Sequence, residues 1–307
     1  MLQENNNKKL VVLAGAVVAA IILLIVVLLA LLSLVPEGPG FGNEVGIIPL
    51  KGTISLENDS FSQQLNALDV VEKIDEASKD PYVKVIFIDI DSGGGSIVAT
   101  KQIVDKIRNT DKPVVAYIGE VGASGAYYVA AASDYIIADA DSITGSIGVI
   151  WISLDVNKLL DDFGVKPVVL KKGTYKDIGS MFREMTDDEK KLLQEMIDDS
   201  FRQFKGDILE FRKGKGLQLS ELDGVADGRI ISGRQALKLN LVDELSSREA
   251  AIKKAAEIGG IKGEPIIKNY SKEEITLADV FFGAGQNFAK GFSSSLNNGT
   301  PLPSIRT

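Results

Sequence analysis

The fold of this chain is decided by the stretch Gly119-Glu-Val-Gly-Ala-Ser-Gly-Ala-Tyr-Tyr-Val-Ala-Ala-Ala-Ser133. The apolar run 113–118 before it predicts a buried strand, and the Ala-rich segment after Ser124 predicts a helix. A serine at such a strand-to-helix turn is exposed at the positive end of the helix dipole, where the N–H of Gly125 is free to face a developing negative oxygen. The alternative is a packed turn, whose small residues only let the helix approach the sheet closely.

The composition removes most of the common catalytic chemistries. The chain contains no histidine and no cysteine, which excludes Ser-His-Asp triads, Cys-His dyads, histidine zinc sites, cysteine metal clusters and disulfides. If Ser124 is a nucleophile, its base is therefore a lysine, a carboxylate or a terminal amine. The formal net charge of −8 and the pI of about 4.9 argue against a nucleic-acid partner.

Residues 10–35 contain no charged side chain, which predicts a membrane span. As a helix with ~1.5 Å per residue the run is on the order of 39 Å long, enough to cross a hydrocarbon core of ~30 Å with some tilt. A buried core helix and a cleaved signal peptide are the alternatives, but the length of the run and the lack of a clear A-x-A site favour an uncleaved anchor. Because Lys8 and Lys9 precede the span, the positive-inside rule puts residues 1–9 in the cytoplasm and everything beyond the linker 36–44 on the extracytoplasmic side of the cell membrane.

Residues 45–270 alternate between strand and helix patterns, which predicts an α/β domain. This alternation is typical of a parallel sheet with right-handed crossovers and helices on both faces. Thr186, followed by three acidic residues, marks the start of a long helix that runs to about Arg212. The remaining residues, 271–307, are predicted to form a C-terminal tail. The predicted strands are 45–54, 83–90, 113–118, 135–138 and 165–170, and the predicted helices before Thr186 are 61–77, 97–107 and the one that follows Ser124.

A glycine-rich loop adds candidate chemistry near Ser124. The loop Asp91-Ser-Gly-Gly-Gly-Ser96 directly follows a predicted core strand. Because ligands gather at the carboxyl ends of the strands in open α/β sheets, we expect this loop and Ser124 to share one rim. Glycines there let backbone N–H groups approach a substrate oxygen, although a glycine run can also serve only to make a sharp turn. The motifs G-x-x-x-x-G-K-[ST] and G-x-G-x-x-G are absent, which argues against a phosphate-binding loop.

The segment Lys171-Lys-Gly-Thr-Tyr-Lys-Asp177 is a candidate source of the base. Most lysines are solvated surface charges. A base, however, needs a neutral amine at the working pH, and burial beside a nucleophile lowers the pKa of a lysine. With no histidine available, a lysine is the natural partner for an activated serine.

Three motifs, taken together and in order, resemble the short, single-domain form of signal peptide peptidase A. They are Gly122-Ala-Ser-Gly-Ala-Tyr-Tyr128, Thr144-Gly-Ser-Ile-Gly-Val149 and Gly173-Thr-Tyr-Lys-Asp177. Ser146 lies 22 residues after Ser124 and Lys176 lies 52 residues after it, and both spacings agree with the family. The resemblance covers roughly residues 46–258 and implies a Clp-protease/crotonase-like fold, with a parallel sheet and flanking helices.

Carried over position by position, the resemblance implies a Ser-Lys dyad with Ser124 as the nucleophile and Lys176 as the general base. Ser146 would hydrogen-bond the lysine amine, and the N–H groups of Gly94 and Gly125 would form the oxyanion hole. No metal or ATP site is apparent in the sequence, so no cofactor is expected.

The resemblance also implies a substrate class and an assembly. The substrates would be residual signal peptides, which are apolar and lie at the membrane lipid, and the protein would form a ring-shaped homo-oligomer whose sites can be completed between subunits. The chain departs from the family at Gly93, where a proline is usual, and this glycine loosens the loop. Two other functions stay open: a crotonase-like enzyme that stabilises a thioester enolate, and a non-catalytic membrane scaffold. A protease of the stomatin-associated type is a nearer alternative with a different substrate.

Overall fold

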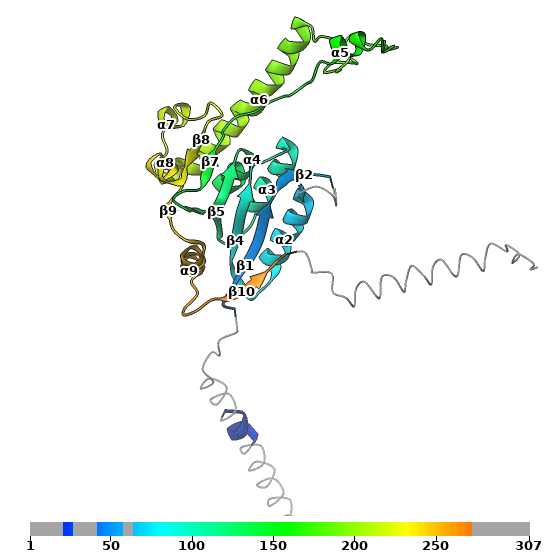
Figure 1. Ribbon diagram of the computed structural model, residues 1–307. Coiled ribbons are helices and arrows are strands. Elements are labelled where there is room, and N and C mark those ends of the chain that lie inside the picture. The colour runs from blue at the N-terminus through cyan, green and yellow to red at the C-terminus, as the bar shows by residue number, and fades with distance from the viewer. Residues whose placement is uncertain (1–20, 27–41, 58–63, 272–307) are drawn as a thin grey trace, which may run out of the picture. The chain divides into compact units, whose positions relative to one another are not determined.

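The computed structural model describes residues 21–26, 42–57 and 64–271 (Figure 1). The chain divides into a unit that ends at Tyr270 and a second unit, Ser271–Thr307. The predicted tail, 271–307, lies outside the described residues apart from Ser271. The predicted span at 10–35 also lies outside them, except for residues 21–26, which are helical. Within the described ranges, no helix combines the length and the apolar character that crossing a membrane requires.

A mostly parallel sheet forms the centre of the first unit, as the alternating pattern predicted (Figure 1). Its strand order is β10-β1-β4-β5-β6-β9, and every neighbouring pair in this order is parallel. The carboxyl ends of its strands therefore meet at one rim. The six strands are β1 (Glu44–Lys51), β4 (Val83–Ser92), β5 (Val114–Ala123), β6 (Tyr135–Ala138), β9 (Glu244–Leu245) and β10 (Ile266–Asn269).

Four short strands extend this arrangement. β7 (Ile143–Gly145) pairs with the end of β5, and β8 (Ile230–Ser232) runs antiparallel to β7. β2 (Thr53–Ser55) and β3 (Gln64–Asn66) form a separate parallel pair. The antiparallel β7–β8 pair is a departure from the purely parallel sheet that the sequence predicted.

Helices cover both faces of the sheet. Alternate residues of β4 point to opposite sides, so Ile86 and Ile88 enter one hydrophobic cluster while Val85 and Phe87 enter the other. Because both faces are buried, β4 is an almost continuous apolar run rather than an alternating one. The first cluster packs against α2 (Ala67–Lys79), α3 (Ile97–Arg108) and α4 (Gly125–Ala131), and the second packs against α9 (Arg248–Ile258).

The long helix α6 (Asp187–Arg212) begins where the sequence placed it. The Thr186 hydroxyl accepts the N–H of Glu189, and the Glu189 carboxylate accepts the N–H of Thr186, which forms a capping box. The C-terminal half of the helix is anchored in the body: Phe204 and Ile208 are buried, and the buried Arg212 guanidinium binds the Asp243 carboxylate at 2.9 Å. The N-terminal half continues beyond the sheet, toward the short helix α5 (Asn157–Asp162) (Figure 1).

We refer to residues 150–186, between β7 and α6, as the arm. The predicted strand 165–170 lies in the arm and is not a strand: the segment belongs to no sheet, and Leu170 is 95% exposed. Its valine-rich sequence favours extended backbone, but a strand also needs a neighbour to accept its hydrogen bonds. The arm offers no such neighbour within the described part of the chain.

The other boundaries deviate only locally from the prediction. The helix predicted at 61–77 begins at Ala67, because the Asn66 side chain caps it by accepting the N–H of Leu68 at 2.8 Å. Residues 61–63 of that prediction lie outside the described residues. The elements not yet named are the 3-10 helix η1 (Lys213–Lys215), α7 (Leu219–Asp223) and α8 (Gly233–Lys238).

Candidate active site

Ser124 occupies the predicted turn between β5 and α4. Its backbone has φ 54° and ψ −123°, a region that residues other than glycine rarely adopt. Two backbone hydrogen bonds fix this conformation: the N–H of Ser124 donates to Gly145 O at 2.8 Å, and its carbonyl accepts the N–H of Tyr128 at 3.0 Å. The Ser124 side chain makes no capping bond to the helix. The turn therefore presents the hydroxyl instead of using it to stabilise α4.

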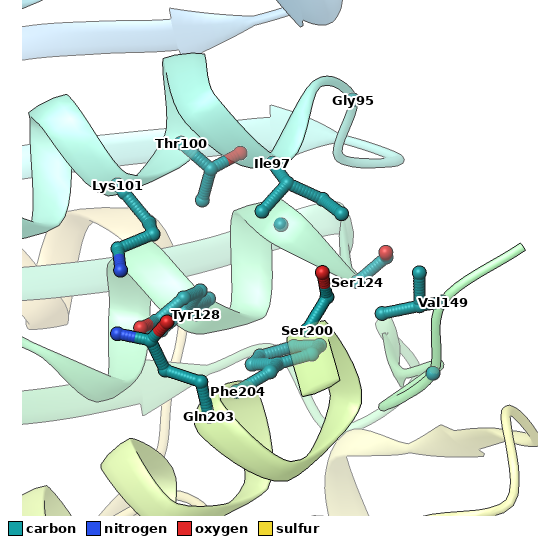
Figure 2. A pocket seen from close by; sticks show the side chains of 12 residues that line it. Gly95, Ile97, Thr100, Lys101, Ser124, Tyr128, Val149, Ser200, Gln203 and Phe204 are labelled. Carbon is teal, nitrogen blue, oxygen red and sulfur yellow. The ribbon is translucent and has the colours of Figure 1, made fainter. Parts of the chain in front are cut away.

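A small pocket of about 60 Å³ lies in front of Ser124 (Figure 2). Figure 2 shows Ser124 between residues of α3, such as Ile97, and residues of α6, such as Phe204. Both apolar and polar side chains line the pocket, and its size suits one small side chain of an extended peptide. Its remaining lining residues are Gly95, Thr100, Lys101, Gly125, Tyr128, Gly148, Val149, Ser200 and Gln203.

The glycine-rich loop meets Ser124, as the sequence predicted. Gly94 has φ +95°, and a side chain there would place its Cβ 2.6 Å from the N of Gly125, so only glycine fits. The N–H of Gly94 donates to Ser92 Oγ at 3.1 Å, whereas no hydrogen bond within the described chain occupies the N–H of Gly95 or of Gly125. Both of these residues line the pocket. Gly95 is thus a candidate oxyanion donor that sequence reasoning missed, because three consecutive glycines cannot be told apart without their backbone directions.

Ser146 is brought close to Ser124 through β7. It directly follows Gly145, whose carbonyl binds the N–H of Ser124, and it shares the unusual positive φ, at 50°. Its own N–H donates to Arg229 O at 2.8 Å, which holds this turn against the segment before β8. The structure therefore gathers Ser124, Ser146 and the glycine loop at one rim of the sheet.

Lys176 is not part of this gathering. It is exposed in the arm, and the lysine that lines the pocket at Ser124 is Lys101. The arm around Lys176 is folded mainly on itself, since the Ser153 hydroxyl donates to Gly179 O at 3.1 Å and the N–H of Val156 donates to Met181 O at 2.8 Å. Within one chain, therefore, the predicted base Lys176 does not line the pocket of the predicted nucleophile Ser124.

An ion network lies directly beside Lys176. Arg183 binds the carboxylates of Asp177 and Glu189, at 2.7 and 2.5 Å, and Lys171 also binds Asp177 at 2.5 Å. Hydrogen bonds from Arg183 and then Lys171 hold the pKa of Asp177 well below its usual range. Arg183, together with the N–H of Thr186, lowers the pKa of Glu189 to about 2. Both carboxylates are therefore ionised at neutral pH.

Acid should loosen this network within a defined pH window. Because the pKa of Glu189 is lower in the folded arm than in an unfolded chain, its stabilising effect is complete above the ordinary value of about 4.3 and is lost as the pH falls toward about 2. Trp151, the only tryptophan of the chain, lies in the arm and reports on it by fluorescence. We expect its emission to be constant above pH of about 4.3 and to change below it. Glu189→Gln should already show altered emission at neutral pH, and an identical acid transition in both proteins would contradict the assignment.

The described residues contain no group of acidic side chains arranged to hold a metal ion.

Residues 106–262 match the model of peptidase family S49. A Methanocaldococcus jannaschii protein named as a protease is 35% identical over 236 residues, covering 76% of this chain and 75% of that protein. An Enterococcus faecium protein named as signal peptide peptidase SppA is 30% identical over 78% of this chain and 65% of its own length. The chloroplastic serine protease SPPA of Arabidopsis thaliana is 27% identical over 81% of this chain, which spans only 37% of that protein.

Proposed function

The chain belongs to peptidase family S49, and on that premise we propose that it is a membrane-anchored serine endopeptidase that hydrolyses residual signal peptides through a Ser124–Lys176 dyad. The observation that carries the proposal is the Ser124 turn. A strained backbone presents a hydroxyl that makes no capping bond to α4, beside the N–H of Gly125, which has no partner within the described chain; both residues line a pocket. This arrangement supplies a nucleophile and an oxyanion donor without a cofactor.

The reaction then follows in two steps. Lys176 removes the proton of Ser124 as the hydroxyl oxygen attacks the peptide carbonyl, and the protonated amine later donates to the leaving nitrogen. Water releases the acyl-enzyme. The oxyanion is stabilised by Gly125 and by Gly94 or Gly95, each N–H contributing ~3 kcal/mol in comparable sites. Gly94 can act only after its N–H leaves Ser92 Oγ, whereas the N–H of Gly95 has no partner in the described chain. Ser146 would hold the lysine amine once it arrives.

We further propose that Lys176 reaches the Ser124 of a neighbouring subunit in a ring-shaped homo-oligomer. Its exposed position in the arm supports this arrangement. The arm also carries apolar side chains that a solitary chain leaves in water, which is typical of an association surface. Those at least 67% exposed are Ile150, Ile152, Leu154, Phe163, Val168 and Leu170. The unpaired segment 165–170 would gain a partner in the same assembly.

Labelling with a fluorophosphonate tests the proposed chemistry. The probe should form one adduct, on Ser124, that is located by mass spectrometry of the digested protein. A crotonase-like enzyme or a scaffold has no activated serine and would stay unlabelled. Labelling without hydrolysis of any apolar peptide would leave a serine enzyme of another kind.

The membrane anchor at 10–35 gives a separate prediction. Because Lys8 and Lys9 precede it, we expect the peptidase domain to face outside. A protease added to intact spheroplasts that express the full chain should degrade most of it, while a cytoplasmic marker stays whole. Survival of the domain until the cells are lysed would mean that the orientation is reversed.

A further inference from the structure

We propose that Arg183 is a positioning residue for peptide hydrolysis, because its guanidinium fastens the Lys176 loop to the first turn of α6. The inference rests on the proposed function, in which Lys176 is the base. It adds a residue that the three motifs and the comparisons do not identify. Arg183, with Asp177 and Glu189, forms an ion clamp that fixes the position of the Lys176 loop relative to α6.

One side of the clamp holds the residue next to Lys176. Arg183 Nε donates to Asp177 Oδ2 at 2.9 Å and its Nη2 donates to Oδ1 at 2.7 Å, so the pair is bidentate. The same Nη2 also reaches the backbone carbonyl of Asp177 at 3.3 Å. Both the side chain and the backbone of the residue that follows Lys176 are thereby fixed.

The other side of the clamp holds α6. Arg183 Nη1 donates to Glu189 Oε2 at 2.8 Å and its Nη2 donates to Oε1 at 2.5 Å, a second bidentate pair. Glu189 is only 2% exposed, and it also completes the capping box with Thr186. One planar guanidinium thus bridges two carboxylates, a geometry that the single ammonium of a lysine cannot reproduce.

The clamp matters because the contacts from Lys171 to Asp177 and from Ser153 to Gly179 hold the Lys176 loop only to other parts of the arm. Glycines with φ +107° and +76°, Gly173 and Gly179, flank the loop, and glycine costs the most entropy to order. The first turn of α6 is a firm support, since Phe204 in the other half of the same helix lines the pocket at Ser124. The helix therefore sets a fixed distance between the base that a subunit carries and its own pocket. In a symmetric ring, that distance decides where the lysine meets the neighbouring site.

Arg183→Lys in the full-length protein tests the inference, because it keeps the positive charge and removes the two bidentate pairs with Asp177 and Glu189. We expect kcat to fall by about 10- to 100-fold with little change in KM, since misplacing a reacting group by ~1 Å costs about that much. Asp177→Asn, which weakens the clamp from the loop side, should lower kcat in the same way. Arg234→Lys is the matched control, because Arg234, on α8, forms an exposed ion pair with Asp141, and the kcat of this variant should stay at the wild-type value.

A double-variant comparison separates positioning from a general structural role. If Arg183 acts through Lys176, adding Arg183→Lys to Lys176→Ala should cause no further loss. The rate of fluorophosphonate labelling of Ser124 stays measurable in slow variants over long incubations, and it serves as the readout. An equal loss on both backgrounds, or a wild-type kcat for Arg183→Lys, overturns the inference. Full activity of Lys176→Ala alone is a different result, because it rejects the proposed dyad itself.

Discussion

Ser124→Ala will lower kcat/KM for peptide hydrolysis by on the order of 10⁵-fold or more, because it removes the nucleophile of a unit whose members act together. The fold should survive. The Ser124 side chain makes no capping bond, and alanine and serine tolerate the positive φ of this turn about equally. Circular dichroism and the melting temperature should stay close to the wild type while activity and fluorophosphonate labelling disappear.

Ser220→Ala is the matched control for this loss, because Ser220 is an exposed serine at the surface of α7. It should retain both activity and labelling. If Ser124→Ala instead keeps substantial activity, Ser124 is a packed turn residue and the nucleophile lies elsewhere.

Lys176→Ala will lower the same kcat/KM by ~10³-fold or more, in the range that general-base catalysis contributes. The amine takes the serine proton in its neutral form, and a chain that lacks histidine has no imidazole to replace it. The double variant Ser124→Ala/Lys176→Ala should be no slower than Ser124→Ala alone, because the two residues form one unit. Lys238→Ala, which removes an exposed lysine of α8 outside the arm, should behave like the wild type.

Three other lysines compete for the role of base. Lys171 and Lys172 lie in the same segment, and Lys101 lines the pocket at Ser124. If Lys176→Ala stays active while alanine at one of these positions abolishes hydrolysis, that lysine is the base. Loss at Lys101 would also place the whole reaction within one chain.

The sequence predicts the central fold well, because it depends on local patterns that the structure keeps. β4 is mostly apolar because helices cover both its faces, and Thr186 with Glu189 marks the start of α6 through a capping box. The prediction of a strand at 165–170 is wrong because a strand does not depend on local patterns alone. Its β-branched residues favour extended backbone, but strand formation depends on a neighbour that local sequence does not specify.

In the candidate site, too, some residues could be predicted from local sequence, whereas the positions of others depend on the tertiary structure. Ser124 and Gly125 follow from a strand-to-helix turn, and β7 brings Ser146 beside them. The role of Gly94 could not be settled from sequence, because the direction of its N–H toward Ser92 depends on the tertiary path of the loop. Sequence spacing also gave no sign that Lys176 lies in an exposed arm, since distance along the chain does not determine distance in space.

Co-expression of the Ser124→Ala chain with the Lys176→Ala chain tests the intersubunit Ser-Lys dyad most directly. Each variant alone should be inactive. In mixed rings, about a quarter of the sites receive an intact Ser124 from one chain and an intact Lys176 from its neighbour, so about a quarter of the wild-type activity should return. If purified mixed assemblies, isolated through two different tags, show no more activity than the separate variants, the site is not shared between subunits and the account is contradicted.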